Sequence, residues 1–137
     1  MFEAKTFDGK TIRLEEMKGK HVLLDFWATW AGERTADIRV LKEVQNTYGK
    51  DGRCVLVGLN LDQDQATATN WVTRNGLGWT QCYLGAWGAS DVPGQFGIQG
   101  LPEVVLVDPE GRIAAKGLRG PGIRNAVRNA LGRTSTP

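Results

Sequence analysis

Few side chains in this sequence have the type and spacing needed for covalent or metal chemistry. The two cysteines, Cys54 and Cys82, lie far apart and form no Cys-x-x-Cys pair, and the only histidine is His21. These residues match neither a zinc-ligand pattern nor a local dithiol. We therefore assign no catalytic residue and expect no metal and no cofactor.

The residues with the strongest positional argument lie in an apolar stretch that runs into a turn and then a helix. Asp25 is the one ionisable residue between His21 and Ala28, which read as a buried central strand. The turn at Thr29–Gly32 follows, with Glu33 and Arg34 at the start of the helix. A strand end followed by a helix start is a common place for a functional group in an α/β protein.

Length and composition indicate one globular domain over residues 1–137, with an ordered core of about 2–132. The chain has 41% hydrophobic residues and a net charge of only +2. This balance gives no reason to expect nucleic acid binding. No apolar run approaches the roughly 20 residues of a membrane helix, so we expect no membrane insertion by this chain. The oligomeric state is left open.

The expected elements alternate between strands and helices. Residues 2–14 read as a β-hairpin around Asp8-Gly9. The remaining elements follow in chain order: strand 21–28, a helix with apolar positions from 38 to 48, strand 54–61, helix 65–74, short strand 79–84, a glycine-rich loop 85–100 with at most a short helix near 91–96, strands 103–107 and 112–116, and a last amphipathic helix over 123–131. This order predicts an α/β fold with a mixed sheet and helices on both faces.

Four segments resemble the TlpA/ResA-like branch of the thioredoxin superfamily, which is related to the redoxin and AhpC/TSA families. They are Asp8 to Lys20, Leu23 to Trp30, Gly97 to Pro102 and Leu106 to Ile113. The resemblance implies a thioredoxin-like fold with an N-terminal hairpin and an inserted helix and strand. It also implies thiol–disulfide oxidoreductase chemistry, which in this family uses a Trp-Cys-x-x-Cys motif at the helix start.

Both cysteines of that motif are replaced in this chain. By position, the first falls on Ala31 and the second on Arg34. Neither side chain can form a thiolate, so we expect no dithiol exchange at this site. Whether the chain is an enzyme then depends on Cys54 and Cys82. The alternatives are two inert core thiols, which we favour, or single-thiol redox activity.

Asp25 corresponds in the family to a buried acid beneath the second cysteine. A buried carboxylate is costly unless it is paired or protonated. One hypothesis is that Arg34 turns inward and pairs with Asp25. The alternative is that Arg34 points to solvent while Asp25 is neutral or bonded to water. We slightly favour the alternative, because a guanidinium is much larger than the thiol that it replaces.

The family also implies a peptide-binding groove beside a cis-proline bond. Its candidate residues here are Trp30, Ala31, Leu101 and Pro102. Our first hypothesis is a redox-inactive module that binds an extended peptide or a partner protein in this groove. The others are redox activity through Cys54 or Cys82, and a structural domain of a larger exported protein. The resemblance further implies an extracytoplasmic or periplasmic location.

Overall fold

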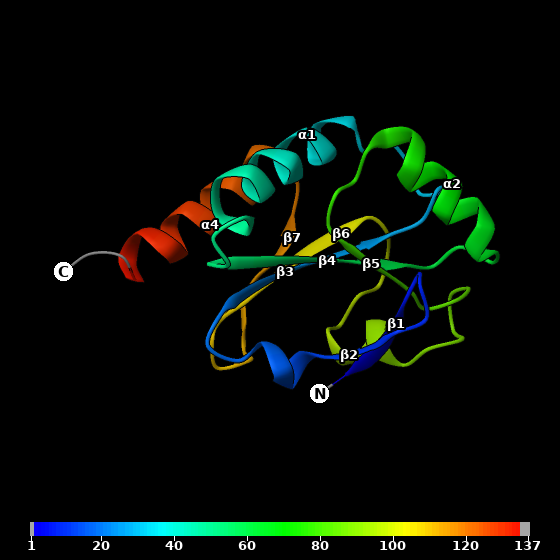
Figure 1. Cartoon of the computed structure of the whole chain (residues 1–137), viewed down its shortest axis with the longest axis horizontal. Helices are drawn as coiled ribbons and strands as arrows, with labels where there is room; N and C mark the ends of the chain where they lie inside the picture. Colours follow the sequence, from blue (N-terminus) through cyan, green and yellow to red (C-terminus); the bar gives the residue numbers. More distant parts are fainter. Residues whose placement is uncertain (1, 135–137) are drawn as a thin grey trace.

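A seven-stranded mixed sheet forms the centre of the protein (Figure 1). The computed structural model describes residues 2–134. The strands are β1 (Glu3–Thr6), β2 (Thr11–Arg13), β3 (His21–Trp27), β4 (Cys54–Asn60), β5 (Thr80–Tyr83), β6 (Glu103–Val107) and β7 (Ile113–Leu118). Their order across the sheet is β2-β1-β5-β4-β3-β6-β7. The expected N-terminal hairpin is present as β1 and β2.

Three longer helices lie on one side of this sheet, as Figure 1 shows. They are α1 (Thr35–Val44), α2 (Gln65–Asn75) and α4 (Pro121–Thr134). The other side carries α3 (Val92–Gln95) and a 3-10 turn (Leu14–Met17). The chain after α1 continues as a π-helical turn over Gln45–Gly49. The predicted mixed sheet with helices on both faces is therefore confirmed.

The central strand β3 is buried along its whole length. It pairs in parallel with β4 and antiparallel with β6, and the partners of Asp25 are Gly58 and Val104. Because side chains alternate along a strand, Leu23 and Asp25 point to the face opposite that of Leu24. This alternation turns Asp25 toward α1.

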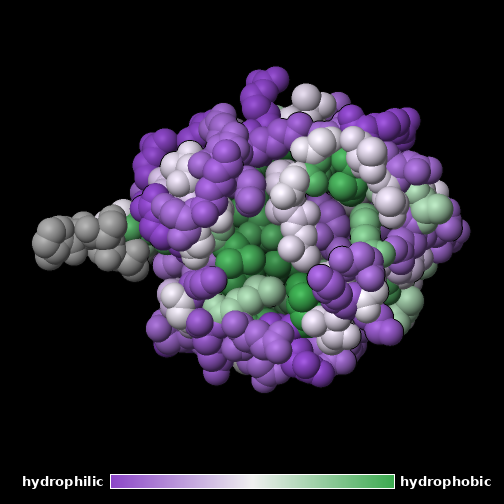
Figure 2. Space-filling model, in the orientation of Figure 1, coloured by the Kyte–Doolittle hydropathy of each residue, from purple (hydrophilic) through white to green (hydrophobic). Residues whose placement is uncertain are grey.

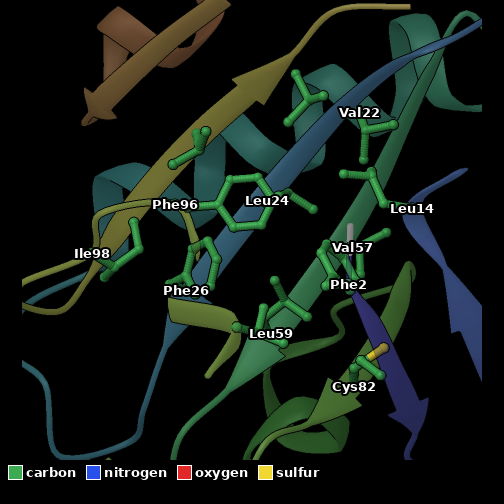
Figure 3. Close-up of a cluster of buried hydrophobic side chains, with 14 of the residues drawn as sticks. Phe2, Leu14, Val22, Leu24, Phe26, Val57, Leu59, Cys82, Phe96 and Ile98 are labelled. Atoms are coloured by element: carbon green, nitrogen blue, oxygen red, sulfur yellow. The ribbon is translucent and has the colours of Figure 1, made fainter. Parts of the chain in front are cut away.

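Two apolar clusters fill the space on the two sides of the sheet. One contains residues of β3, β4 and β6 together with Phe2, Phe96 and Cys82 (Figure 3). The Phe96 ring lies with its centroid 5.8 Å from that of Phe2. The other cluster packs Leu23 and Cys54 against α1 and α4. The two cysteines therefore belong to opposite sides of the sheet.

Several boundaries differ from those expected from the sequence. Helix α1 begins only at Thr35, three residues after the turn that ends at Gly32. The last strand lies at Ile113–Leu118, displaced toward the C-terminus from the expected 112–116. Helix α4 begins at Pro121, a favourable first position for a helix. Hydrophobic spacing locates the buried middle of an element better than its ends, which explains these shifts.

Seen from the side of Figure 1, the surface is mainly hydrophilic (Figure 2). Hydrophobic residues gather in the middle of this face, below α1 and α4. No helix in residues 2–134 is long and apolar enough to cross a membrane.

Candidate functional site

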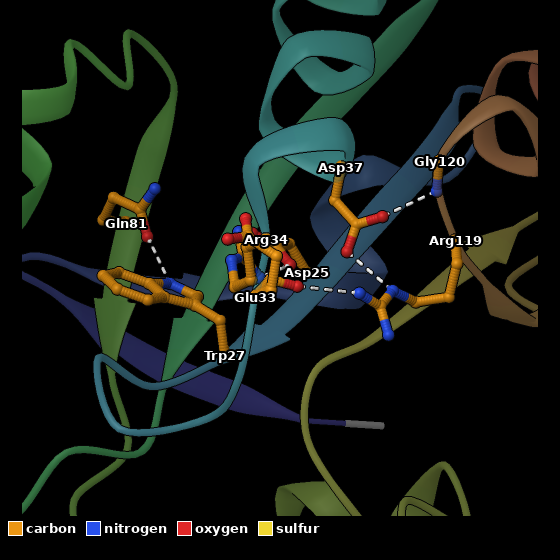
Figure 4. A network of polar contacts seen from close by, with 8 residues as sticks. All are labelled: Asp25, Trp27, Glu33, Arg34, Asp37, Gln81, Arg119 and Gly120. Carbon is orange, nitrogen blue, oxygen red and sulfur yellow. Dashed lines mark hydrogen bonds and ion pairs between the residues drawn. The ribbon is translucent and has the colours of Figure 1, made fainter.

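The start of α1 holds a buried ion pair. Arg34 donates from Nη1 to Asp25 Oδ1 at 2.7 Å and from Nη2 to Asp25 Oδ2 at 2.8 Å (Figure 4). Asp25 is 1% exposed and Arg34 is 4% exposed. This bidentate geometry is the strongest form of an arginine–carboxylate contact.

The pairing overturns our slight preference for an Arg34 side chain in solvent. Arg34 lies immediately before α1, with φ −128° and ψ 7°, and Asp25 faces that helix from the strand below. The guanidinium lies 5.4 Å from the centroid of the Trp27 ring, so aromatic surface covers part of it. Its size, which we took as an obstacle, is accommodated between the strand and the helix start.

The charge state of Arg34 reflects two opposing effects. Burial by itself lowers the pKa of a guanidinium, because the charged form loses hydration. The Asp25 carboxylate opposes this with its charge and its hydrogen bonds, and Asp37 adds a smaller attraction, so the pKa of Arg34 is raised. Arg34 therefore stays charged and bound to Asp25 across the physiological pH range.

A second polar contact holds the Trp27 side chain in place. The Trp27 indole N–H donates to Gln81 Oε1 at 3.0 Å. Gln81 lies on β5 and fills the space above Gly58, where any Cβ would overlap its carboxamide. Gln81 was not predicted from the sequence, although an isolated glycine inside an apolar strand is a recognised sign of a close neighbour.

A third contact fixes the first turn of α1 to the start of α4. The Asp37 carboxylate accepts from the Gly120 backbone N–H at 2.6 Å and from Arg119 Nε at 2.7 Å. Arg119 also donates to the Glu33 carbonyl oxygen at 3.0 Å. Sequence spacing could not reveal this contact, because Asp37 and Arg119 are 82 positions apart.

The structure separates Cys54 from Cys82. The β4 residue paired with Cys82 is Leu59, which lies toward the opposite end of that strand from Cys54. Both thiols are free and buried. Burial raises the pKa of each thiol to about 12. Neither thiol has the exposure or the low pKa of a reactive cysteine.

The four candidate groove residues differ in exposure. Trp30 is 60% exposed and Ala31 is buried. Leu101 and Pro102 are half-buried, and the peptide bond between them is cis. Glu103 is the first β6 residue paired with β3, so Leu101 and Pro102 precede the paired part of the strand.

Trp30 also borders an open pocket of about 630 Å³ on the side of the loops that follow β4 and β5. Its lining residues are Trp30, Leu61, Asp62, Gln63, Asp64, Thr67, Ala86 and Trp87. Leu101 and Pro102 are not among them. The pocket could not be predicted from the sequence, because its shape depends on the conformation of the glycine-rich loop that carries Ala86 and Trp87. Within residues 2–134, no group of three or more His, Cys, Asp or Glu residues could hold a metal ion.

A mixed sheet with this strand order, whose central strand leads into a helix packed on the sheet, defines a thioredoxin-like fold. The family model described as "Thioredoxin-like" matches residues 19–113. The chain belongs to this family.

Curated relatives and solved structures agree with this assignment. The thiol-disulfide oxidoreductase ResA of Bacillus thuringiensis is 27% identical over 112 residues, which cover 82% of this chain and 62% of ResA. The thiol:disulfide interchange protein DsbE of Yersinia pestis is 34% identical over 110 residues, covering 80% of this chain and 52% of DsbE. This chain thus spans about three fifths of ResA and half of DsbE.

Among solved structures, a thiol-disulfide oxidoreductase from Bacteroides fragilis superposes with a TM-score of 0.85. Its identity is 24%, and the match covers 93% of this chain and 95% of that one. A thiol:disulfide interchange protein from a Bacteroides species has a TM-score of 0.77 and 29% identity, covering 95% and 85% of the two chains. The predicted fold and family are confirmed.

Proposed function

We propose that this chain is a thioredoxin-like module that performs no dithiol–disulfide exchange and binds an extended segment of another polypeptide. The observation that carries the proposal is the bidentate pair between Arg34 and Asp25. By the family resemblance, Arg34 occupies the position of the second active-site cysteine. The pair therefore replaces a reactive thiol with a side chain that is charged, buried and held in place.

The other two cysteines do not restore the chemistry. A thiol with a pKa near 12 is almost wholly protonated at neutral pH, and the thiolate is the form that attacks a disulfide. Burial also denies a protein substrate access to Cys54 and Cys82. These observations disfavour the single-thiol alternative.

The features that suit a polypeptide ligand do not depend on thiols. Trp30 exposes a large indole surface at the helix start. Leu101 and Pro102 lie just before the paired part of β6. An extended chain that adds beside this backbone as a strand is a common mode of peptide recognition. Aromatic anchors of this kind dominate binding energies in many interfaces.

We also propose an extracytoplasmic location, following the resemblance to ResA and DsbE. ResA is named a thiol-disulfide oxidoreductase and DsbE a thiol:disulfide interchange protein. Exported proteins meet unfolded and partly folded chains, which suits a module that binds an extended segment.

The binding proposal is tested by titrating the ¹⁵N-labelled chain with an unfolded peptide. We expect chemical shift changes at the Trp30 indole N–H and the Leu101 amide. The Trp30→Ser substitution is expected to weaken binding about tenfold, as for an aromatic anchor. Ile113→Ser is the matched control, because Ile113 is also an exposed apolar residue, at 44%, but lies on the edge strand β7.

An absence of shifts with any peptide would contradict the binding proposal and leave a structural role in a larger protein. Equal weakening by Trp30→Ser and Ile113→Ser would show that the contact is not made at the helix start.

A further inference from the structure

The 630 Å³ pocket beside Trp30 combines two exposed tryptophans with acidic residues. Trp30 is 60% exposed and Trp87 is 47% exposed. With Ile113, they are the large hydrophobic residues most open to solvent among those that the structure describes. Both tryptophans line the same pocket, although Trp30 precedes α1 and Trp87 lies in the glycine-rich loop after β5.

The charges in this pocket have one sign. Asp62 and Asp64 line it, and its eight lining residues include no Lys, Arg or His. The pocket is thus negative in a chain whose net charge is +2. A cation would meet both opposite charge and the electron-rich faces of indole rings there.

The two carboxylates are held in different ways. Asp62 is buried and accepts hydrogen bonds from the backbone and hydroxyl of Thr29 and from Asn60. These bonds fix the turn that carries Trp30. Asp64 is exposed, and its Oδ2 caps α2 by accepting from the Thr67 backbone N–H at 3.2 Å. The Asp64 carboxylate is therefore open to a ligand while its position is fixed by the helix.

We infer that this pocket binds the side chain of a lysine or arginine in the bound polypeptide. The inference rests on the proposed function, since Trp30 borders both the peptide-binding surface and the pocket. It adds a preference: a segment that places a basic residue beside Trp30 gains contacts with Trp87 and Asp64. A neutral or acidic residue at that place forms no ion pair with Asp64 and no cation–aromatic contact.

The preference is tested with three fluorescein-labelled eight-residue peptides. They share one apolar sequence and carry lysine, glutamine or glutamate at the centre. We expect the lysine peptide to bind the native chain about two- to fivefold more tightly than the glutamine peptide, as for an exposed cation–aromatic contact. The glutamate peptide is expected to bind most weakly, and added salt should reduce the differences.

The Asp64→Asn substitution separates charge from structure, because asparagine is an equally good helix cap. We expect this variant to prefer the lysine peptide less than the native chain does, because the contacts of the lysine with Trp30 and Trp87 remain. Asp51→Asn is the matched control, because it removes the same charge at the other end of β4. Asp51 precedes this strand and Asp64 follows it. The control should keep the native preference. Trp87→Leu should reduce the preference without abolishing binding of the glutamine peptide.

The outcomes distinguish this inference from the proposed function. Equal affinities for all three peptides on the native chain would overturn the preference and leave peptide binding intact. No binding of any peptide would overturn both. Binding of a neutral oligosaccharide such as maltohexaose, with no peptide bound, would assign the two tryptophans to sugar stacking and contradict the inference.

Discussion

Arg34 makes an electrostatic contact at the position where the family resemblance implies a redox-active cysteine. Its guanidinium and the Asp25 carboxylate are both buried and make two short hydrogen bonds with each other. Desolvating two charges costs about as much as their attraction returns, so such a pair adds little net stability. Removing one partner of the pair is strongly destabilising, because the remaining charge stays buried without a partner.

Arg34→Met is therefore expected to lower the free energy of unfolding by about 3–5 kcal/mol, and Asp25→Leu by a similar amount. The double variant should lose much less than the sum, because no unpaired charge remains. Urea unfolding of the four proteins measures this coupling. A double variant as destabilised as the sum of the single ones would contradict a paired geometry.

His21 gives the fold a dependence on pH. Burial lowers the pKa of this imidazole below 6.5, although Asp108 and Glu110 partly oppose the effect. The unfolded chain then binds a proton more readily than the folded one. The contribution of His21 to stability is therefore present above pH 6.5 and is lost as the pH falls below that value.

The measurement for His21 is urea unfolding between pH 5.5 and 8. We expect the native chain to lose stability toward the acid end and His21→Gln to lose less of it. Parallel pH profiles for the two proteins would assign the acid sensitivity to other groups.

At the scale of elements, the start of α1 is held by contacts with its neighbours rather than by its own sequence. Asp37 joins it to α4 through the Gly120 N–H and the Arg119 guanidinium. Arg34 joins it to β3. These contacts fix the helix start, and with it the preceding turn that carries Trp30.

Asp37→Ala is expected to cost about 2–3 kcal/mol of unfolding free energy, because the buried Gly120 N–H loses a charged acceptor. Asp37→Asn should cost less, since its amide oxygen can still accept one bond. Glu43→Gln serves as the control: it removes an exposed partner of Arg124 between the same two helices and should change stability little. Thermal or urea unfolding gives the comparison, and equal effects of Asp37→Ala and Glu43→Gln would contradict it.

The approach of β5 to β4 depends on Gly58. Adding a methyl group there forces the Gln81 carboxamide away from the Trp27 indole. Gly58→Ala is expected to cost about 1–3 kcal/mol by overpacking. The same substitution should cost less in a Gln81→Ala background, where the space is open. Equal costs in the two backgrounds would show that Gln81 is not what excludes the methyl group.

At the scale of the whole molecule, the sequence predicts the fold well and the site only in part. The apolar run of β3, the Asp8-Gly9 hairpin and the alternation of strands and helices depend on local patterns, and the structure contains them all. The pairing of Asp25 with Arg34 was one of two hypotheses, because side-chain direction depends on where the helix begins. The contacts of Asp37 and Gln81 join distant segments, so no local pattern reveals them.

Both thiols are expected to be unreactive in the folded chain. Cys54 and Cys82 should show almost no reaction with Ellman's reagent in buffer and should both react in urea. Rapid reaction of either thiol in the native protein would contradict its burial and reopen single-thiol chemistry.

We propose that this thioredoxin-like chain has no thiol–disulfide activity of its own. The most direct test measures how far the protein accelerates the reduction of insulin by dithiothreitol. Three proteins are compared: the native chain, the Cys54→Ser/Cys82→Ser variant and the Ala31→Cys/Arg34→Cys variant. We expect background rates for the first two proteins and a gain of activity for the third, in which two cysteines stand at the helix start. A rate above background in the native chain that disappears in the Cys54→Ser/Cys82→Ser variant would contradict this proposal.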